Sequence, residues 1–196
     1  MNTQDLFPIV IGKDTIRSTY SLDNIDWRRS QDNNGWISKD NRLLEQQQFA
    51  DLKLQIILKH KQYMDRIGVV APVEWRIQNS WANRHDPGDW AQQHHHSNSA
   101  FSGVYYSQVP EGDSGSIQFH KQHATVSTNS WEFDFAIGPA NAYSWGFQPV
   151  PGDCVLFPSH VAHSVTPNNT QGQRISIAWN ILPHGEWGHG LHSVYR

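Results

Sequence analysis

The chain has 196 residues, a formal net charge of −3 at pH 7, 12 histidines, 9 tryptophans and one cysteine. This length is enough for one domain with a sizeable buried core, and a single cysteine excludes an internal disulfide. The small negative charge, without a dense cluster of lysine and arginine, argues against nucleic acid as a partner. No apolar run is long enough to span a membrane, so no membrane partner is expected.

One long helix is expected within residues 42–68. Five apolar side chains recur there at helical spacing and predict one buried stripe: Phe49, Leu52, Ile56, Tyr63 and Ile67. Gly68 suits the end of such a helix. The stripe indicates packing against a core and implies no chemistry.

After Gly68 the sequence changes to short apolar runs separated by Gly, Pro, Asn and Ser, which is typical of a sandwich or closed β-structure. Residues 131–137, WEFDFAI, alternate most clearly, and further strands are expected at 102–106, 115–120, 153–158 and 174–181. We therefore expect a mainly β fold, a double-stranded β-helix (jelly roll) with one or more N-terminal supporting helices. The expected single domain covers residues 1–196, with helical support over about 1–70, a β core over about 71–183 and a tail over 184–196.

Three consecutive histidines precede the strand expected at 102–106. If this run is extended, His94 and His96 share one face and His95 points away. A His-x-His pair can then bind a metal through two imidazoles. Taken alone, the pair is better explained as a polar surface run, so the metal hypothesis needs further ligands.

Further candidate ligands lie downstream, where His160 and His163 occupy a short connection before the last strand. The alternation of that strand places four side chains on one face: Arg174, Ser176, Ala178 and Asn180. An arginine and a serine two residues apart suit a carboxylate, which a guanidinium fork and a hydroxyl can bind together. An edge-strand arginine that faces water is the alternative explanation.

Together these residues resemble the 2-oxoglutarate- and Fe(II)-dependent oxygenases, whose usual signature is His-x-Asp/Glu, a distal His and then Arg-x-Ser. More narrowly, three segments are similar to an oxygenase family found in bacteria and tailed phages: SWANRHDPGDWAQQHHHSNSAFSGVYY, GDCVLFPSHVAHSVTPN and RISIAWN. The resemblance covers residues 80–180, and LFPIV near the N-terminus is also similar. The motifs occur in the family's order, which makes the resemblance specific.

The resemblance implies His94, His96 and His163 as the ligands of Fe(II), with His163 favoured over His160 by its spacing to Arg174. His96 stands where most members of the superfamily have Asp or Glu. Three neutral imidazoles leave the charge of the metal uncompensated by protein.

Two carboxylates precede the histidine run and keep an alternative open. Asp86 or Asp89 would then join the metal site or replace one of its histidines.

The resemblance also implies a site for the cosubstrate 2-oxoglutarate. Arg174 would pair with its distal carboxylate, Ser176 would assist, and Tyr106 would donate a hydrogen bond to the same carboxylate. Asn180 would line the pocket. The Trp-rich segments before the histidines, with Trp75, Trp81 and Trp90, are candidates to close it.

The activity implied is that of a dioxygenase of the hydroxylase type, which couples oxidative decarboxylation of 2-oxoglutarate to oxidation of a C–H bond by dioxygen. The substrate, a small molecule or a protein side chain, would be recognised by residues 86–93 and 24–40. The first residues lack the features of a signal peptide, so a cytoplasmic location is expected, in the host if a phage encodes the chain.

Three other hypotheses stay open at this point. A cupin-like dioxygenase would bind its substrate directly to a three-His metal, although it has no general need for Arg174 and Ser176. A three-His zinc hydrolase is a variant of that hypothesis. A non-catalytic jelly-roll module for binding or structure would need no metal at all.

Two other features are expected to be structural. Cys154 lies in an apolar run, as a small buried hydrophobe does. The tail brings His184, His189 and His192 close in sequence, but it is Gly-rich and terminal, so we expect a mobile or docked tail rather than a second metal site.

Overall fold

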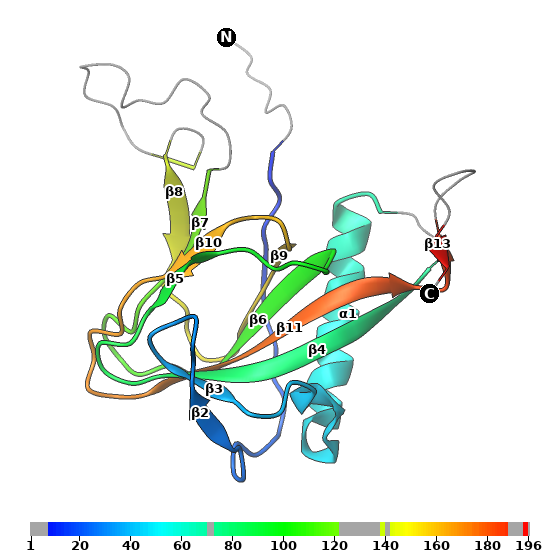
Figure 1. Cartoon of the computed structure of the whole chain (residues 1–196). Helices are drawn as coiled ribbons and strands as arrows, with labels where there is room; N and C mark the ends of the chain where they lie inside the picture. Colours follow the sequence, from blue (N-terminus) through cyan, green and yellow to red (C-terminus); the bar gives the residue numbers. More distant parts are fainter. Residues whose placement is uncertain (1–7, 70–72, 122–137, 140–141, 188–193, 196) are drawn as a thin grey trace, which may run out of the picture.

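The computed structural model describes residues 8–69, 73–121, 138–139, 142–187 and 194–195 (Figure 1). Within these ranges the strands form a seven-stranded sheet, a four-stranded sheet and a two-stranded ribbon, and every strand pairing is antiparallel. The strand expected at 131–137 lies outside the described residues, as do His189 and His192.

The seven-stranded sheet, here called the major sheet, has the order β1-β9-β6-β11-β4-β3-β2. Its strands are β1 (Gly12–Thr15), β2 (Trp27–Arg29), β3 (Trp36–Ser38), β4 (Glu74–His85), β6 (Phe101–Gln108), β9 (Asp153–Pro158) and β11 (Arg174–His184). The β2–β3 hairpin adds to the free edge of β4 (Figure 1).

The four-stranded sheet, here called the minor sheet, has the order β5-β10-β7-β8. Its strands are short: β5 (Ala91–His94), β7 (Ile117–His120), β8 (Ser144–Phe147) and β10 (His163–Val165). The ribbon consists of β12 (Glu186–Trp187) and β13 (Val194–Tyr195).

From β4 to β11 the strands alternate between the two sheets, except that the consecutive strands β7 and β8 both belong to the minor sheet. The strands β4, β6, β9 and β11 lie together in the major sheet, and β5, β7, β8 and β10 form the minor sheet. Two antiparallel sheets built in this alternating way are a double-stranded β-helix. The predicted fold class is confirmed.

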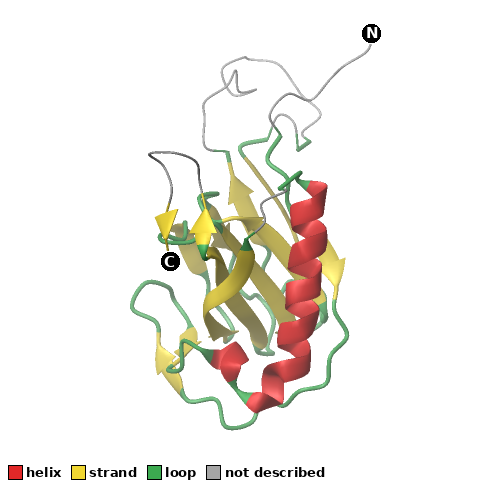
Figure 2. Cartoon of the chain, turned by 90° about the vertical axis from the view of Figure 1, so that its right-hand side faces the viewer, coloured by secondary structure: helices red, strands yellow, loops and turns green. Residues whose placement is uncertain are grey.

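The helix α1 (Ala50–Arg66) lies along one face of the major sheet (Figure 2). All five side chains of the predicted stripe pack in this layer, and Ile177 and Trp179 meet them from β11. The helix ends at Arg66, and Gly68 follows two residues later with a φ of 76°, in the left-handed region that suits glycine after a helix.

The start of the helix differs from the prediction. Two short 3-10 turns, η1 (Leu43–Glu45) and η2 (Gln47–Phe49), replace its first part. The backbone of Gln46 between them is extended, and the Leu44 N–H donates to the Ser80 hydroxyl at 2.8 Å. This tertiary contact with β4 takes up a backbone donor and ties the first turn to the sheet.

The other face of the major sheet is turned toward the minor sheet. A second apolar cluster fills part of the space between them: Val104, Tyr106, Ile117, Val155 and Phe157. The alternation predicted for the last strand is observed, since Ile177 and Trp179 face the helix while Arg174 and Ser176 face this space. In the described part of the chain, no helix is long and apolar enough to cross a membrane.

Candidate metal centre

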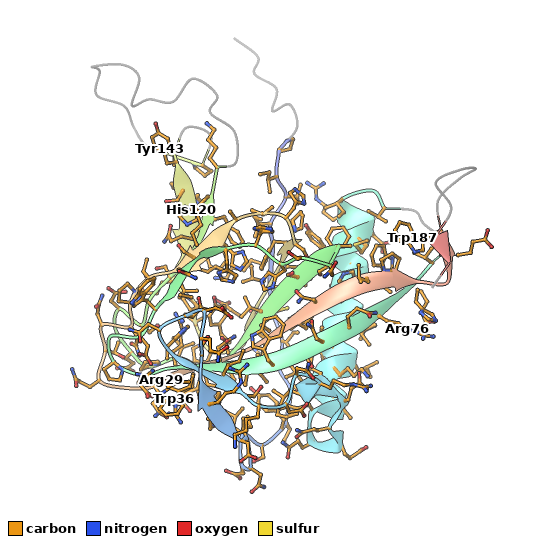
Figure 3. The ribbon with its side chains drawn as sticks, in the orientation of Figure 1. Arg29, Trp36, Arg76, His120, Tyr143 and Trp187 are labelled. Carbon is orange, nitrogen blue, oxygen red and sulfur yellow. The ribbon has the colours of Figure 1, made fainter. Side chains whose placement is uncertain are left out.

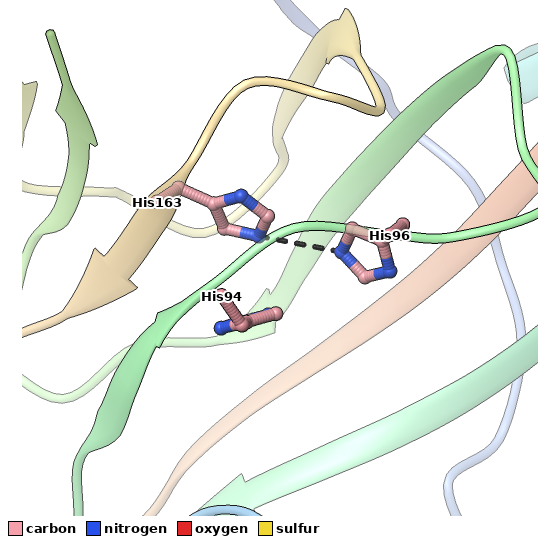
Figure 4. A group of neighbouring side chains, drawn as sticks. All are labelled: His94, His96 and His163. Atoms are coloured by element: carbon pink, nitrogen blue, oxygen red, sulfur yellow. Dashed lines mark hydrogen bonds between the residues drawn. The ribbon is translucent and has the colours of Figure 1, made fainter. Parts of the chain in front are cut away.

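Three histidines from two strands and a loop converge between the sheets (Figure 4). His94 ends β5 and pairs in register with His163, the first residue of β10, while His96 follows β5 by two residues. One ring nitrogen from each side chain lies within 4.8 Å of the others. The structure therefore brings together the three predicted ligands.

Two of these rings are oriented by backbone carbonyls. The His94 Nδ1 donates to the Gln92 carbonyl at 2.8 Å, and the His163 Nδ1 donates to the Val161 carbonyl at 3.0 Å. A carbonyl only accepts, so Nδ1 carries the proton in both rings and Nε2 keeps its lone pair. This is the tautomer that binds a metal through Nε2.

Burial keeps two of the three rings, His96 and His163, neutral. His163 is 5 % exposed and packs against the Phe157 ring at 4.7 Å between centroids. Desolvation, and after it the neighbouring imidazoles, lowers the pKa of His163 to about 3 and that of His96 to about 4. At neutral pH these rings are therefore in the uncharged form that metal binding requires.

The carboxylate alternatives lie elsewhere. Asp89 is buried, where it accepts the Asp86 N–H at 3.0 Å and pairs with Arg29 at 3.3 Å. Asp86 pairs with Arg84 at 3.3 Å. Within the described residues, neither carboxylate belongs to the histidine cluster. The exposed His160 is outside it too.

The histidines line a cavity of about 330 Å³. Arg174, Ser176 and Tyr106 line the same cavity from the major sheet. The structure thus brings together six of the seven residues predicted for the site. Asn180 is not among the lining residues, and its side-chain carbonyl accepts a hydrogen bond from the Ser102 hydroxyl at 2.7 Å.

The turn between β2 and β3 also lines the cavity. Ser30, Asp32 and Asn33 line it there, within the segment 24–40 expected to read a substrate. Of the tryptophans proposed to close the pocket, Trp81 lines it. Trp75 packs against the core beneath α1, and Trp90 is exposed.

Arg174 is buried, at 1 % exposure, and makes three hydrogen bonds. Its Nη1 donates to the carbonyls of Ser114 at 3.1 Å and Gly115 at 3.0 Å, and its Nη2 donates to Nδ1 of His85. Its Nε has no partner, and in the described part of the chain no carboxylate pairs with it. The sequence contains no local signal for these partners, because they come from distant segments.

An anion fits this guanidinium. A buried charge without a counterion costs several kcal/mol, and desolvation lowers the pKa of Arg174, although a guanidinium stays protonated. Three of its five N–H groups are used, which leaves two, the number that a carboxylate accepts in a bidentate pair. Burial also raises the pKa of Tyr106 to about 12, so its phenol remains a hydrogen-bond donor.

The donor set of the cavity therefore suits a metal together with a dicarboxylate. Three imidazole nitrogens suit divalent iron or zinc, and Arg174 offers an uncompensated positive charge at another wall of the same cavity. The residues present fit both groups.

Comparison with known proteins gives a family and a fold. A family model described as "Putative 2OG-Fe(II) oxygenase" matches residues 79–180. The comparison with curated proteins gave no match.

Similar solved structures share this fold at low identity. An oxidoreductase of the 2OG-Fe(II) oxygenase family from Burkholderia pseudomallei is 14% identical, with a TM-score of 0.56 over 81% of this chain and 72% of its own. HygX from Streptomyces hygroscopicus, solved with nickel, 2-oxoglutarate and hygromycin B, is 14% identical, with a TM-score of 0.55 over 83% and 75%. A prolyl-4-hydroxylase from Pseudomonas putida is 17% identical, with a TM-score of 0.51 over 79% and 77%.

Proposed function

The chain belongs to the 2OG-Fe(II) oxygenase family, and from this premise we propose that it is a hydroxylase in which His94, His96 and His163 hold Fe(II) and Arg174 binds 2-oxoglutarate. One observation supports the assignment of residues: one cavity is lined by three imidazoles and by a buried guanidinium that no carboxylate of the described residues pairs with. Neither a three-His dioxygenase without a cosubstrate nor a non-catalytic module supplies a negatively charged partner for that guanidinium.

Bound Fe(II) and 2-oxoglutarate supply the activation of dioxygen, coupled to oxidative decarboxylation of the cosubstrate to succinate. The chain's own residues bind and orient. Arg174 gives its two remaining N–H groups to the distal carboxylate, and Tyr106 and Ser176 donate hydroxyl hydrogen bonds to it. The carbonyl partners of His94 and His163 fix the direction of their ring nitrogens.

The cavity also limits water and substrate. Val104, Ile117 and Phe157 form an apolar wall beside the histidines, which excludes water from the reacting groups. A volume of about 330 Å³ lies at the small end of ligand pockets, so the cosubstrate and only a projecting part of the substrate fit inside. The rest of the substrate contacts the polar turn between β2 and β3.

The first test is an anaerobic titration of chelator-treated protein with Fe(II) and then 2-oxoglutarate, followed by the visible charge-transfer band of the chelated complex. The band is expected to need both additions. It is expected to be lost in His163→Ala, and its 2-oxoglutarate dependence is expected to weaken in Arg174→Ala. His160→Ala, an exposed histidine three residues from His163, is the matched control and should behave as wild type.

The alternatives predict other results. Tight iron binding without a response to 2-oxoglutarate would favour a direct three-His dioxygenase, and binding of zinc in preference to iron with hydrolysis would favour the hydrolase. Absence of metal binding would leave the non-catalytic module. Once a substrate is found, incorporation of one labelled oxygen atom from dioxygen would distinguish hydroxylation from other oxidations.

A further inference from the structure

We propose that His85 is a positioning residue for Arg174, a neutral imidazole that holds the guanidinium toward the cavity in place of a carboxylate. The inference rests on the proposed function, because it concerns the residue to which the 2-oxoglutarate carboxylate is assigned. It adds to that function an explanation of how the Arg174 guanidinium is held in one orientation while its positive charge stays available to the carboxylate of 2-oxoglutarate.

The strand register sets the two side chains beside each other. His85 is the last residue of β4, and it pairs with Arg174, the first residue of β11. It is 5 % exposed, lines the cavity and accepts a hydrogen bond from the Arg174 Nη2 on its Nδ1. Asn168 fixes this end of the pair, since its amide donates to the carbonyls of His85 at 3.1 Å and Gly172 at 2.8 Å.

The imidazole is also held from its other side. A Cβ built on Gly35 would lie 2.7 Å from the His85 Cδ2 and 3.1 Å from its Nε2, so the backbone at Gly35 packs directly on the ring. The next residue, Trp36, is covered by the guanidinium groups of Arg29 at 5.0 Å and Arg84 at 4.5 Å. Figure 3 shows Arg29 and Trp36 side by side at the β2–β3 hairpin.

The neutral partner has a chemical consequence. An aspartate or glutamate at this position would form an ion pair with Arg174 and compete with the carboxylate of a ligand. A neutral imidazole nitrogen accepts one N–H and fixes the direction of the guanidinium, but it leaves the charge uncancelled. Desolvation, and then the charge of Arg174, lowers the pKa of His85 to about 3, so the acceptor form persists at neutral pH.

Three substitutions of His85 separate the effect of its hydrogen-bond acceptor from the effects of side-chain volume and of charge at this position. His85→Phe keeps a ring and removes the acceptor, His85→Gln restores an amide acceptor, and His85→Asp adds a carboxylate. His60→Phe is the matched control, because His60 is also buried, at 3 % exposure, but packs between Trp75 and Phe101 beneath the opposite face of the sheet.

The measurement is the Kd of 2-oxoglutarate for the Zn(II)-loaded protein by calorimetry, together with the Kd of Zn(II) and the melting temperature. His85→Phe is expected to weaken 2-oxoglutarate binding about tenfold or more while metal affinity stays within about twofold. His85→Gln should recover most of the loss. His85→Asp should bind 2-oxoglutarate more weakly than His85→Phe although it strengthens the contact with Arg174, and His60→Phe should bind as wild type.

A second variant leaves His85 in place. The added methyl group of Gly35→Ala would push on the His85 ring from the side of the β2–β3 hairpin, so this variant is also expected to bind 2-oxoglutarate more weakly. It tests the inference if the His85 variants do not fold. Wild-type affinity for 2-oxoglutarate in either His85→Phe or His85→Asp would overturn the inference, as would wild-type affinity in Gly35→Ala. A wild-type protein that does not bind 2-oxoglutarate would instead refute the proposed function.

Discussion

Gly115 supports both the fold and the position of Arg174, and its replacement by alanine is expected to damage both. Its φ is 85°, and a Cβ there would collide with the Thr166 carbonyl oxygen and lie 3.1 Å from the Arg174 Nη1. The left-handed conformation costs a residue with a Cβ about 1–2 kcal/mol. The collision with a backbone atom adds about 1–3 kcal/mol, as overpacking does.

The free energy of unfolding should therefore fall by about 2–5 kcal/mol in Gly115→Ala, which corresponds to roughly 4–20 °C in melting temperature for a chain of this size. Gly88→Ala is the matched control: its φ is 83°, but a Cβ there has no atom within 4 Å. The control should lose only the conformational part, about 1–2 kcal/mol. Urea unfolding of the two variants measures the difference.

The same substitution should weaken 2-oxoglutarate binding, since the Gly115 carbonyl accepts one of the Arg174 hydrogen bonds. Calorimetry on both variants tests this. Equal stabilities for Gly115→Ala and Gly88→Ala would refute the reasoning about the collision. Unchanged 2-oxoglutarate affinity in Gly115→Ala would refute the coupling to Arg174.

Two further predictions concern buried groups outside the site. Burial lowers the pKa of His60 from 6.5 to about 4, so the unfolded chain binds a proton that the folded chain does not between these values. This contribution to the free energy of unfolding is fully present above pH 6.5 and is lost as the pH falls toward 4. Between pH 7 and pH 5, the free energy of unfolding of wild type should therefore fall by about 2 kcal/mol more than that of His60→Phe, as measured by urea unfolding. Equal losses would contradict it. Burial raises the pKa of Cys154 to about 12, and the side chain is 1 % exposed, so a thiol reagent should modify it only after unfolding; rapid labelling of the native protein would show that the thiol is reachable.

The sequence predicted those features that depend on local periodicity. The buried stripe of α1 follows from helical spacing, and the opposite faces of β11 follow from alternation, which correctly separated Arg174 and Ser176 from Ile177 and Trp179. The convergence of His94, His96 and His163 was implied by family resemblance, and the structure brings them together.

Features that depend on long-range pairing were missed. The strand β4, EWRIQNSWANRH, is largely polar, and much of it is only half-buried, so it lacks a clear apolar alternation. Without β4 and its register, nothing in the sequence indicates that His85 contacts Arg174. The exclusion of Asp86 and Asp89 also depends on ion pairs with arginines that the sequence does not reveal.

The candidate site is divided between the two sheets. His94 and His163 belong to the minor sheet, whose strands have only three or four residues, whereas Arg174 and Tyr106 belong to the long strands of the major sheet. Short strands with few neighbours open more readily than a core sheet covered by a helix. Opening of the minor sheet would release a bound metal while the major sheet and α1 stayed folded. A ligand that contacts both sheets would oppose this opening and so slow the release of the metal.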